Sequence, residues 1–155
     1  MQINIARTAF VIVFFATFAL STVPAAQAAQ CSNGGVAGDF GFTSTGTVVL
    51  AAGTIPFGAV GRVTFDVAGN IIGSQTASIN GHVAPETING TITVFPDCRT
   101  TATVNILEAG TLVRTTTLRG VFDENQTEFR IIFASVTTPS GPLSTVITIE
   151  GKRLF

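Results

Sequence analysis

The sequence predicts an all-β domain, an eight-stranded antiparallel up-and-down barrel, with a β-sandwich as the alternative. Three observations support this fold class. Short β-branched runs alternate apolar and polar residues, turn residues separate the runs at spacings of about ten, and no stretch beyond residue 28 keeps a helical period. Eight short strands with tight turns are typical of a sandwich or a barrel. The barrel is favoured because a series of hairpins that closes on itself leaves no exposed sheet edge.

Residues 1–28 have the three zones of an export signal and are expected to form a signal-peptide helix that is removed from the mature chain. Arg7 supplies the positive charge, residues 9–20 form a short apolar core, and Ala-Gln-Ala at 26–28 matches a cleavage site. The apolar core is shorter than the roughly 20 residues of a membrane span, so an uncleaved anchor is the weaker alternative. We therefore expect residues 29–155 to be a single secreted or periplasmic domain.

The composition argues against several classes of partner. Without Arg7, seven of the eight basic residues remain against nine acidic ones, a net charge of −2, and no basic patch would bind nucleic acid or anionic lipid. The sequence also contains no Trp and no Tyr. Carbohydrate-binding β domains usually stack sugars on the flat rings of these residues, so a lectin-like role is disfavoured. Nucleic acid, a membrane and a sugar are therefore not predicted as partners of the mature domain.

The predicted strands of the first half of the domain each have an apolar face. Phe40 and Phe42 share one face of the first strand, and Val63, Phe65 and Val67 share one face of the second. A third strand ends at an Asn-Gly hairpin signal, and a fourth ends at a Pro-Asp turn. These four strands are residues 39–50, 57–67, 71–79 and 87–95.

Breaks between these strands are predicted from turn residues and proline. Residues 51–56 interrupt the chain after the first strand, and Gly69 and Asn70 turn it after the second because both accept a positive φ. Residues 81–86 contain Pro85 and are expected to be irregular or an edge, since proline cannot donate a hydrogen bond to a neighbouring strand.

The second half of the domain continues the pattern. Ala102, Val104 and Ile106 face one way in the fifth strand, and turn-rich segments at 108–110 and 123–126 precede the sixth and seventh strands. A Pro-Ser-Gly-Pro segment leads to the eighth strand. The last four strands are predicted at residues 100–107, 111–122, 127–136 and 144–153.

Both cysteines, Cys31 and Cys98, fall in the predicted mature domain. In an exported chain an even cysteine count indicates a disulfide, here between a coil at 31–38 that crosses one end of the barrel and the turn at 96–98. Closing so long a loop contributes roughly 4 kcal/mol in the chain-entropy model. The alternative, two free thiols or half of a metal site, has no supporting His-x-His or Cys-x-x-Cys spacing.

Four segments carry a resemblance to a known group of proteins. They are F-D-V-A-G-N at 65–70, N-G at 80–81, G-T-I-T-V at 90–94 and D-C-R-T-T at 97–101. Together they resemble small secreted bacterial β-barrel proteins that carry F-D-x-x-G-N, G-T-Y-T-V and D-C-T-G-T in this order and have no assigned activity. Ile92 stands here for the usual Tyr, and R-T-T for T-G-T. The resemblance implies a secreted β fold. A weaker similarity to lipocalin-like (calycin) barrels lacks the tryptophan that marks lipocalins.

No catalytic residue, metal site or cofactor is predicted. The one histidine, His82, follows the Asn-Gly turn and is interpreted as an exposed loop residue, because no Ser or Cys motif accompanies it. Asp66, Asp97, Asp123 and Glu124 stand at strand ends or turns, where carboxylates cap backbone N–H groups. No spacing matches a zinc site or a calcium loop. The polar residues therefore favour a protein that is not an enzyme.

The apolar interior supplies the remaining functional hypothesis. At eight strands a barrel is either filled by side chains or wide enough for one small ligand. Simple core packing is the competing interpretation, because burying each large apolar side chain already contributes roughly 1.5 to 3 kcal/mol. The residues predicted to line a pocket for a small hydrophobic ligand are Phe40, Phe42, Phe65, Phe129 and Phe133, with Val63, Ile131 and Ile147.

We therefore predict an exported, non-enzymatic β-barrel that binds a small hydrophobic ligand or an extracellular partner. A first alternative is an enzyme of the cyclase or isomerase kind, which requires Gln75, Arg114 or Arg130 to point inward. A second is a structural cell-surface module with a filled interior and an exposed apolar patch. A third is a small outer-membrane barrel, which the C-terminal Phe155 favours and Arg153 in the last strand opposes.

Overall fold

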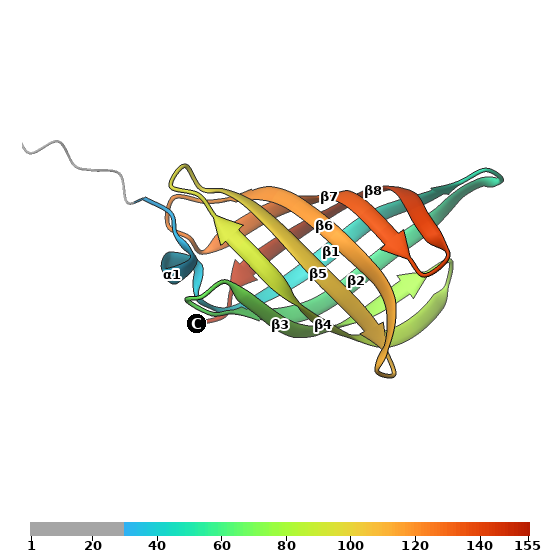
Figure 1. Cartoon of the computed structure of the whole chain (residues 1–155), viewed down its shortest axis with the longest axis horizontal. Coiled ribbons are helices and arrows are strands. Elements are labelled where there is room, and N and C mark those ends of the chain that lie inside the picture. The colour runs from blue at the N-terminus through green and yellow to red at the C-terminus, as the bar shows by residue number, and fades with distance from the viewer. Residues whose placement is uncertain (1–29) are drawn as a thin grey trace, which may run out of the picture.

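The structure is a computed structural model, and it describes residues 30–155. The predicted signal peptide, residues 1–28, lies outside the described residues. Eight antiparallel strands form one closed barrel, in which each strand pairs with the next and β8 (Gly141–Arg153) pairs back with β1 (Gly38–Leu50) (Figure 1). The predicted up-and-down barrel is therefore confirmed, and the β-sandwich alternative is wrong.

One short helix precedes the strands. Its N-cap is Ser32, whose hydroxyl accepts a hydrogen bond from the Gly35 N–H at 3.1 Å. The predicted coil at 31–38 is thus partly helical, although it does lie across one end of the barrel, as expected (Figure 1). In chain order the elements are α1 (Asn33–Val36), β1 (Gly38–Leu50), β2 (Gly53–Phe65), β3 (Asn70–Ile79), β4 (His82–Val94), β5 (Arg99–Glu108), β6 (Thr111–Phe122), β7 (Glu128–Thr138) and β8 (Gly141–Arg153).

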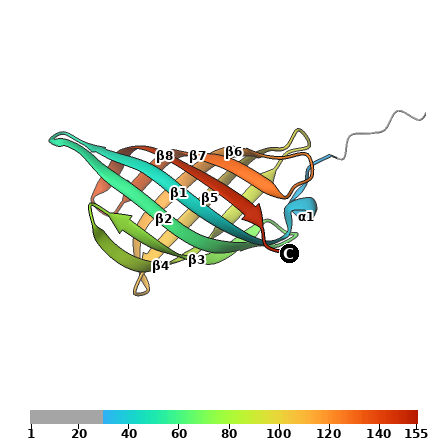
Figure 2. The ribbon, with the colours of Figure 1, turned by 180° about the vertical axis from the view of Figure 1, so that it is seen from behind.

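The two ends of the barrel differ in their connections (Figures 1 and 2). The end that carries α1 and the C-terminus, called here the helix end, has four- and five-residue connections at 66–69, 95–98 and 123–127. The opposite end, called here the hairpin end, has two-residue connections at 51–52, 80–81, 109–110 and 139–140. The β1–β2 hairpin projects beyond the rest of the barrel at the hairpin end.

The inward faces follow the predicted alternation, with one exception. Phe40 and Phe42 of β1 and Val63 and Phe65 of β2 are buried, and so are the three predicted residues of β5. Val67 was predicted to share the inward face of β2, and this prediction is wrong, since its side chain is 74% exposed. The reason is that β2 ends two residues earlier, so Val67 belongs to a connection at the helix end.

The predicted strand boundaries are wrong at three prolines, which lie inside β2, β4 and β8 rather than between strands. Pro56 pairs with β1, but the β2–β3 ladder begins only at Phe57. Pro85 pairs with β3 only, because the β4–β5 ladder begins at Glu86. Pro142 pairs with β7 only, because the β8–β1 ladder ends at Ser144. Each proline therefore lies where the strand is paired on one side only, an edge-like position at which proline is tolerated.

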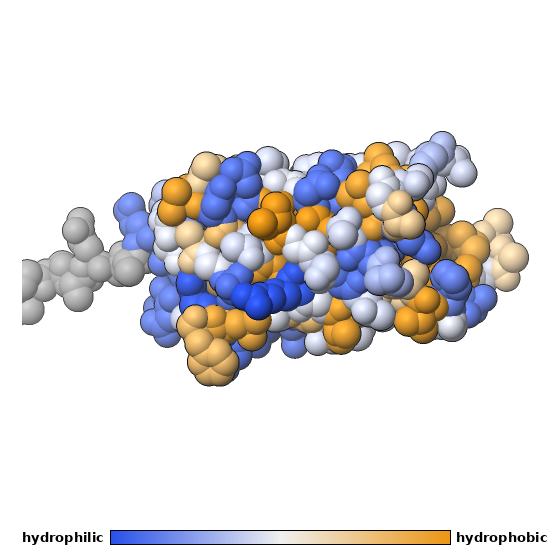
Figure 3. Space-filling model, turned by 90° about the horizontal axis from the view of Figure 1, so that it is seen from below, coloured by the Kyte–Doolittle hydropathy of each residue, from blue (hydrophilic) through white to orange (hydrophobic). Residues whose placement is uncertain are grey.

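The exterior mixes polar side chains with scattered apolar ones. Val60, Ile72, Val83 and Val146 are each more than half exposed on the outer face of their strands. Figure 3 shows orange patches interspersed with blue and white ones, with orange also at the end where the β1–β2 hairpin projects. Within residues 30–155, no helix is long and apolar enough to cross a membrane.

Candidate functional site

Four phenylalanines fill the barrel interior at the helix end. The rings of Phe40, Phe65, Phe122 and Phe129 pack with centroids 5.2 to 6.1 Å apart, at tilted or edge-to-face angles that aromatic pairs favour. Val36 of α1 is completely buried in the same core cluster. The four rings, called here the phenylalanine plug, therefore close the interior at this end.

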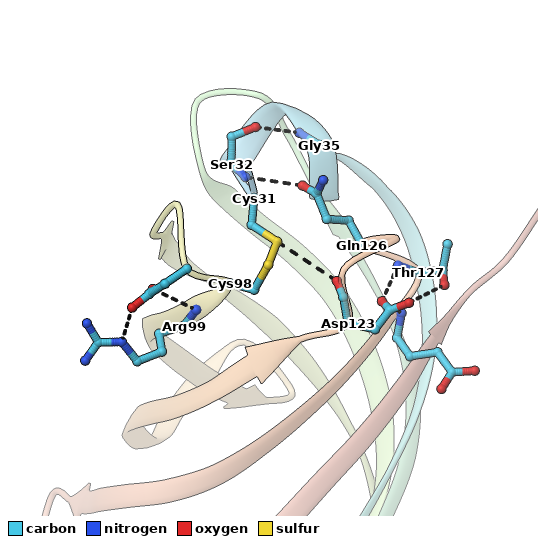
Figure 4. The surroundings of a disulfide bond; sticks show 10 residues. Cys31, Ser32, Gly35, Cys98, Arg99, Asp123, Gln126 and Thr127 are labelled. Carbon is cyan, nitrogen blue, oxygen red and sulfur yellow. Dashed lines mark hydrogen bonds and ion pairs between the residues drawn. A yellow bond between two sulfur atoms is a disulfide. The ribbon is translucent and has the colours of Figure 1, made fainter. Parts of the chain in front are cut away.

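A disulfide joins Cys31, just before α1, to Cys98 in the 95–98 connection (Figure 4). Because Val36 of α1 is buried in the same core cluster as the phenylalanine plug, this bond fastens α1 over the plug. Cys31 and Cys98 are at bonding distance, as predicted, with their Cα atoms 4.9 Å apart. The Asn33 side chain adds two hydrogen bonds to β4, donating to the Ile92 carbonyl at 3.3 Å and accepting from the Val94 N–H at 2.8 Å. A bonded cysteine pair indicates an oxidising environment.

The aspartates at the helix end cap the connections, as predicted, whereas Glu124, also predicted as a cap, makes no such hydrogen bond within residues 30–155. The side-chain and backbone N–H groups of Asn70 donate to Asp66 at 2.6 and 2.7 Å, and they hold the pKa of Asp66 below its ordinary value. Burial acts to raise the pKa of Asp123. The backbone N–H groups of Glu128 and Thr127, at 2.7 and 2.6 Å, outweigh burial, so the pKa of Asp123 is lowered as well.

The other titratable residues singled out in the sequence lie at the surface. Asp97 accepts a hydrogen bond from Arg99 Nε at 2.6 Å, and this bond lowers the pKa of Asp97. His82 and Glu124 are exposed, His82 as the first residue of β4 rather than in a loop. Within the described part of the chain, no three His, Cys, Asp or Glu residues are grouped so as to hold a metal ion. None of these groups lies in the barrel interior.

Beyond the phenylalanine plug, the middle of the barrel holds a cavity of about 60 Å³, called here the inner cavity. Phe40 was predicted to line a pocket but belongs to the plug instead, and Ile147 lines a different cavity at the hairpin end. That any of these residues binds a ligand stays a prediction. The predicted residues that line the inner cavity are Phe42, Val63, Phe65, Phe129, Ile131 and Phe133.

A second cavity of about 200 Å³, called here the outer chamber, lies at the hairpin end. Val48, Leu50 and Ile55 of the β1–β2 hairpin line it, together with Phe57 and Ile147. The Leu50 side chain is 40% exposed, so the outer chamber reaches the protein surface. Its volume exceeds the roughly 150 Å³ of a protein cavity that holds benzene, whereas the inner cavity is smaller than that.

An ion pair lies inside the barrel between the two cavities. Arg114, which lines both, donates from its two terminal nitrogens to Glu86 Oε1 and Oε2 at 2.6 and 2.7 Å. Gln75 Nε2 donates to Glu86 Oε2 at 2.6 Å, and the Arg114 guanidinium carbon lies 5.8 Å from the centroid of the Phe57 ring. Because desolvating two charges costs about as much as their attraction returns, stability alone does not explain this pair in an apolar interior.

Two buried polar atoms beside this pair have no hydrogen-bond partner within residues 30–155. They are Nε of Arg114 and Oγ1 of Thr116, which lie at successive inward positions of β6. Arg114 is 8% exposed and Thr116 is 1% exposed, and both line the inner cavity. Mostly apolar walls with a few convergent polar groups are typical of small-molecule binding sites. The interior therefore combines room for an apolar molecule with unused hydrogen-bonding groups.

Sequence reasoning found part of this polar cluster and missed the rest. Gln75 and Arg114 point inward, as the enzyme alternative requires, but Arg130 is exposed and pairs with Glu150 at 3.8 Å. Glu86 was missed because it follows a proline and was assigned to an irregular segment. The sequence did indicate that Glu86 points inward, because Glu86 lies two residues before Ile88, a buried residue of the same strand. Thr116 was missed for a different reason, because threonines occupy both faces of this barrel.

Comparisons with known proteins add a similarity of fold. No protein-family model matches the chain, and no curated protein matches it. A redesigned beta barrel, mFAP1, bound to DFHBI, aligns with a TM-score of 0.51 and 19% identity over 78% of this chain and 97% of that chain. EF1p2_mFAP2b bound to DFHBI aligns with a TM-score of 0.55 and 14% identity over 77% of this chain and 94% of that chain. At these identities the similarity shows the fold alone.

Proposed function

We propose that this protein is an exported, non-enzymatic β-barrel that binds one small, largely apolar molecule in its interior and takes it up at the hairpin end. The observation that carries the proposal is the pair of cavities. The same interior packs four rings tightly at the helix end and yet leaves about 60 and 200 Å³ unfilled toward the hairpin end. Since native cores normally leave few voids larger than a water molecule, unfilled volume lined by large apolar residues favours a binding role.

Two further observations support the proposal. The two solved barrels named above are bound to DFHBI, so a barrel of this architecture is able to hold a ligand. Export is supported by the signal-like sequence of residues 1–28 together with the bonded pair of Cys31 and Cys98, which favours a secreted or periplasmic location. A ligand that partitions poorly into water is a reasonable cargo for such a protein, because the chamber walls are apolar.

The test compares two adjacent positions of β1 with opposite orientations. Val48 lines the outer chamber, whereas Val49 is 40% exposed on the outside of the same strand. Toluene is titrated into the isotope-labelled mature protein and followed by backbone amide NMR. We expect saturable binding to the unaltered protein and to Val49→Phe, and at least tenfold weaker binding to Val48→Phe. Absence of saturable binding, or equal loss in both variants, contradicts the proposal.

A second experiment addresses the natural ligand. Native mass spectrometry of protein purified from its own host is expected to show an additional mass that is lost on denaturation and absent from Val48→Phe. The same additional mass on Val48→Phe would place the bound molecule elsewhere on the protein.

A second candidate function is an isomerase or cyclase that acts on an apolar substrate in the same cavities. The observation that favours it is the Gln75, Glu86 and Arg114 cluster between them, because acid–base chemistry requires polar groups in contact with the substrate. The ligand recovered from the host separates the two functions. Conversion of that compound by the purified protein, lost in Gln75→Leu, would favour the enzyme, and its unchanged release favours a binding protein.

A further inference from the structure

We infer that the ligand carries an uncharged oxygen acceptor, such as a ketone or ester carbonyl, that is bound by Arg114 Nε–H and Thr116 Oγ1 while its apolar body fills the outer chamber. This inference rests on the proposed function and specifies the chemical class of the ligand. It follows from three features of the interior: where the unpaired polar atoms lie, why they cannot find partners within the barrel, and how the charge of Arg114 is balanced.

The unpaired atoms lie where a ligand from the outer chamber would arrive. Arg114 lines both the outer chamber and the inner cavity, and Thr116 lines the inner cavity one inward position further along β6. A molecule with its body among Phe57, Ile147 and the β1–β2 hairpin therefore meets Arg114, which both cavities share. We expect a polar group that extends past Arg114 into the inner cavity to reach Thr116. Both residues are more than nine-tenths buried, so bulk water does not compete strongly for them.

Arg114 is held in a way that leaves Nε free for a ligand. Both terminal nitrogens are engaged by Glu86, and Glu86 is itself held by Gln75. The guanidinium group is planar and rigid, so it cannot turn Nε toward another acceptor without breaking the two bonds to Glu86. Within residues 30–155 no protein acceptor reaches Nε or Thr116 Oγ1. A fixed donor and a rotatable hydroxyl inside an apolar space form a selective site for an oxygen acceptor.

The charge balance indicates that the acceptor is uncharged. Arg114 is the single charged residue among the described residues that line either cavity, and the carboxylate of Glu86 already neutralises it. A ligand carboxylate would bring a second negative charge next to one guanidinium, in a site where charges are poorly solvated. A carbonyl oxygen accepts the same hydrogen bond without that repulsion. The site is therefore expected to prefer a ketone or ester over a carboxylate of the same shape.

Three probes of nearly identical shape test this inference. Acetophenone carries a carbonyl, isopropylbenzene replaces it with an apolar branch, and benzoate replaces the methyl group with a negatively charged oxygen. Each is titrated into the isotope-labelled mature protein, and the Arg114 Nε–H resonance, assigned by its loss in Arg114→Lys, is followed by proton–nitrogen NMR. We expect acetophenone to shift this resonance at saturation, isopropylbenzene to leave it nearly unchanged, and benzoate to bind at least tenfold more weakly than acetophenone.

Thr116→Val is the matched variant, because it removes an unpaired hydroxyl and keeps the shape of the side chain. We expect this variant to bind acetophenone about fivefold more weakly, the equivalent of one neutral hydrogen bond. Its affinity for isopropylbenzene is expected to stay within twofold of that of the unaltered protein. Thr100→Val is the control, because Thr100 is equally buried but donates to the Thr93 carbonyl at 3.0 Å and lines neither cavity. We expect it to leave both affinities unchanged.

The outcomes separate this inference from the proposed function. Binding of isopropylbenzene together with an unmoved Nε–H resonance under saturating acetophenone overturns the inference and leaves the proposed function intact. If benzoate binds more tightly than acetophenone, the inference that the ligand's acceptor is uncharged is wrong. If Thr116→Val weakens the binding of acetophenone and isopropylbenzene equally, the variant acts through the shape of the cavity, and the proposed hydrogen bond from Thr116 is wrong. Failure of all three probes to bind contradicts the proposed function and the inference together.

Discussion

The two ends of this barrel are built from different kinds of turn. At the helix end, each connection forms a turn with a backbone hydrogen bond between residues i and i+3. The last residue of each of these turns has a positive φ; these residues are Gly69, Cys98 and Gln126. At the hairpin end the connections have two residues, and Asn80-Gly81 and Ala109-Gly110 both have positive φ at each position, as a type I′ hairpin requires. All four aspartates of the chain also lie at the helix end.

The interior follows the same division. The helix end is filled by rings, covered by α1 and fastened by a disulfide. The hairpin end has no comparable cover within the described residues, and its interior contains the outer chamber and the Arg114–Glu86 pair. Four- and five-residue connections accompany a helix over a closed core at one end, whereas the other end has two-residue hairpins and no helix within residues 30–155. The helix end is therefore the more extensively fastened half, and the proposed ligand binding belongs to the hairpin end; four predictions test this division.

The largest effect is expected from unpairing the buried charges. Glu86→Leu leaves the Arg114 guanidinium buried without its partner, so we expect the free energy of unfolding to fall by about 3 to 5 kcal/mol. Adding Arg114→Met removes the unpaired charge and is expected to restore most of that loss. Urea denaturation of the single and double variants measures both changes. A double variant no more stable than Glu86→Leu would mean that the pair itself, rather than the unpaired charge, determines the stability.

The second effect concerns the fastening of the helix end. Replacing Cys31 and Cys98 together by Ser is expected to lower the free energy of unfolding by about 2 to 4 kcal/mol, because the unfolded chain regains the freedom of a long loop. Hydrogen exchange is expected to increase around α1 and the 95–98 connection. Toluene affinity is expected to stay within twofold, since neither cysteine lines either cavity. A large loss of toluene affinity would show that the two ends are coupled.

The division of the barrel was only partly visible in the sequence. Alternation with a period of two predicted the closed barrel, because it depends on backbone geometry alone and survives errors of a few residues at strand ends. The plugged and open ends of the interior were not predictable. Phe40 and Phe42 are two residues apart on one inward face, yet Phe40 packs in the plug and Phe42 lines the inner cavity. That difference depends on which strands face each other across the barrel, which the alternation of a single strand does not encode.

The third prediction compares one phenylalanine from each end. Phe40 is completely buried against three other rings, whereas Phe133 is half-buried and lies between the two cavities, 6.1 Å from the Phe57 ring. Phe40→Ala is expected to cost about 4 kcal/mol and Phe133→Ala about 2 kcal/mol, because removing a ring that already borders a void forfeits fewer contacts. Thermal and urea unfolding measure the difference of about 2 kcal/mol. Equal costs would mean that the plug is no better packed than the cavity walls.

The smallest effect is a pH dependence at the helix end. Hydrogen bonds from Thr64 and Arg62 lower the pKa of Asp39, and comparable bonds lower the pKa of Asp66, Asp97 and Asp123, all at the helix end. A carboxyl whose pKa is lower in the folded protein stabilises it above the ordinary value of 3.8, and that contribution is lost as pH falls through the folded pKa.

Stability is therefore expected to decrease on acidification below about pH 4, with the loss appearing first at the helix end, because acid protonates the carboxylates that cap its connections. Hydrogen exchange compared at pH 5 and pH 3, after correction for the intrinsic pH dependence of exchange, is expected to show weaker protection near 66–69 and 123–127 at the lower pH. Protection at the two-residue hairpins is expected to hold. Asp66→Asn should abolish the pH response around 66–69 and leave the response at 123–127. If protection at the hairpin end is lost first, the carboxylate caps are not what makes the helix end the more stable half.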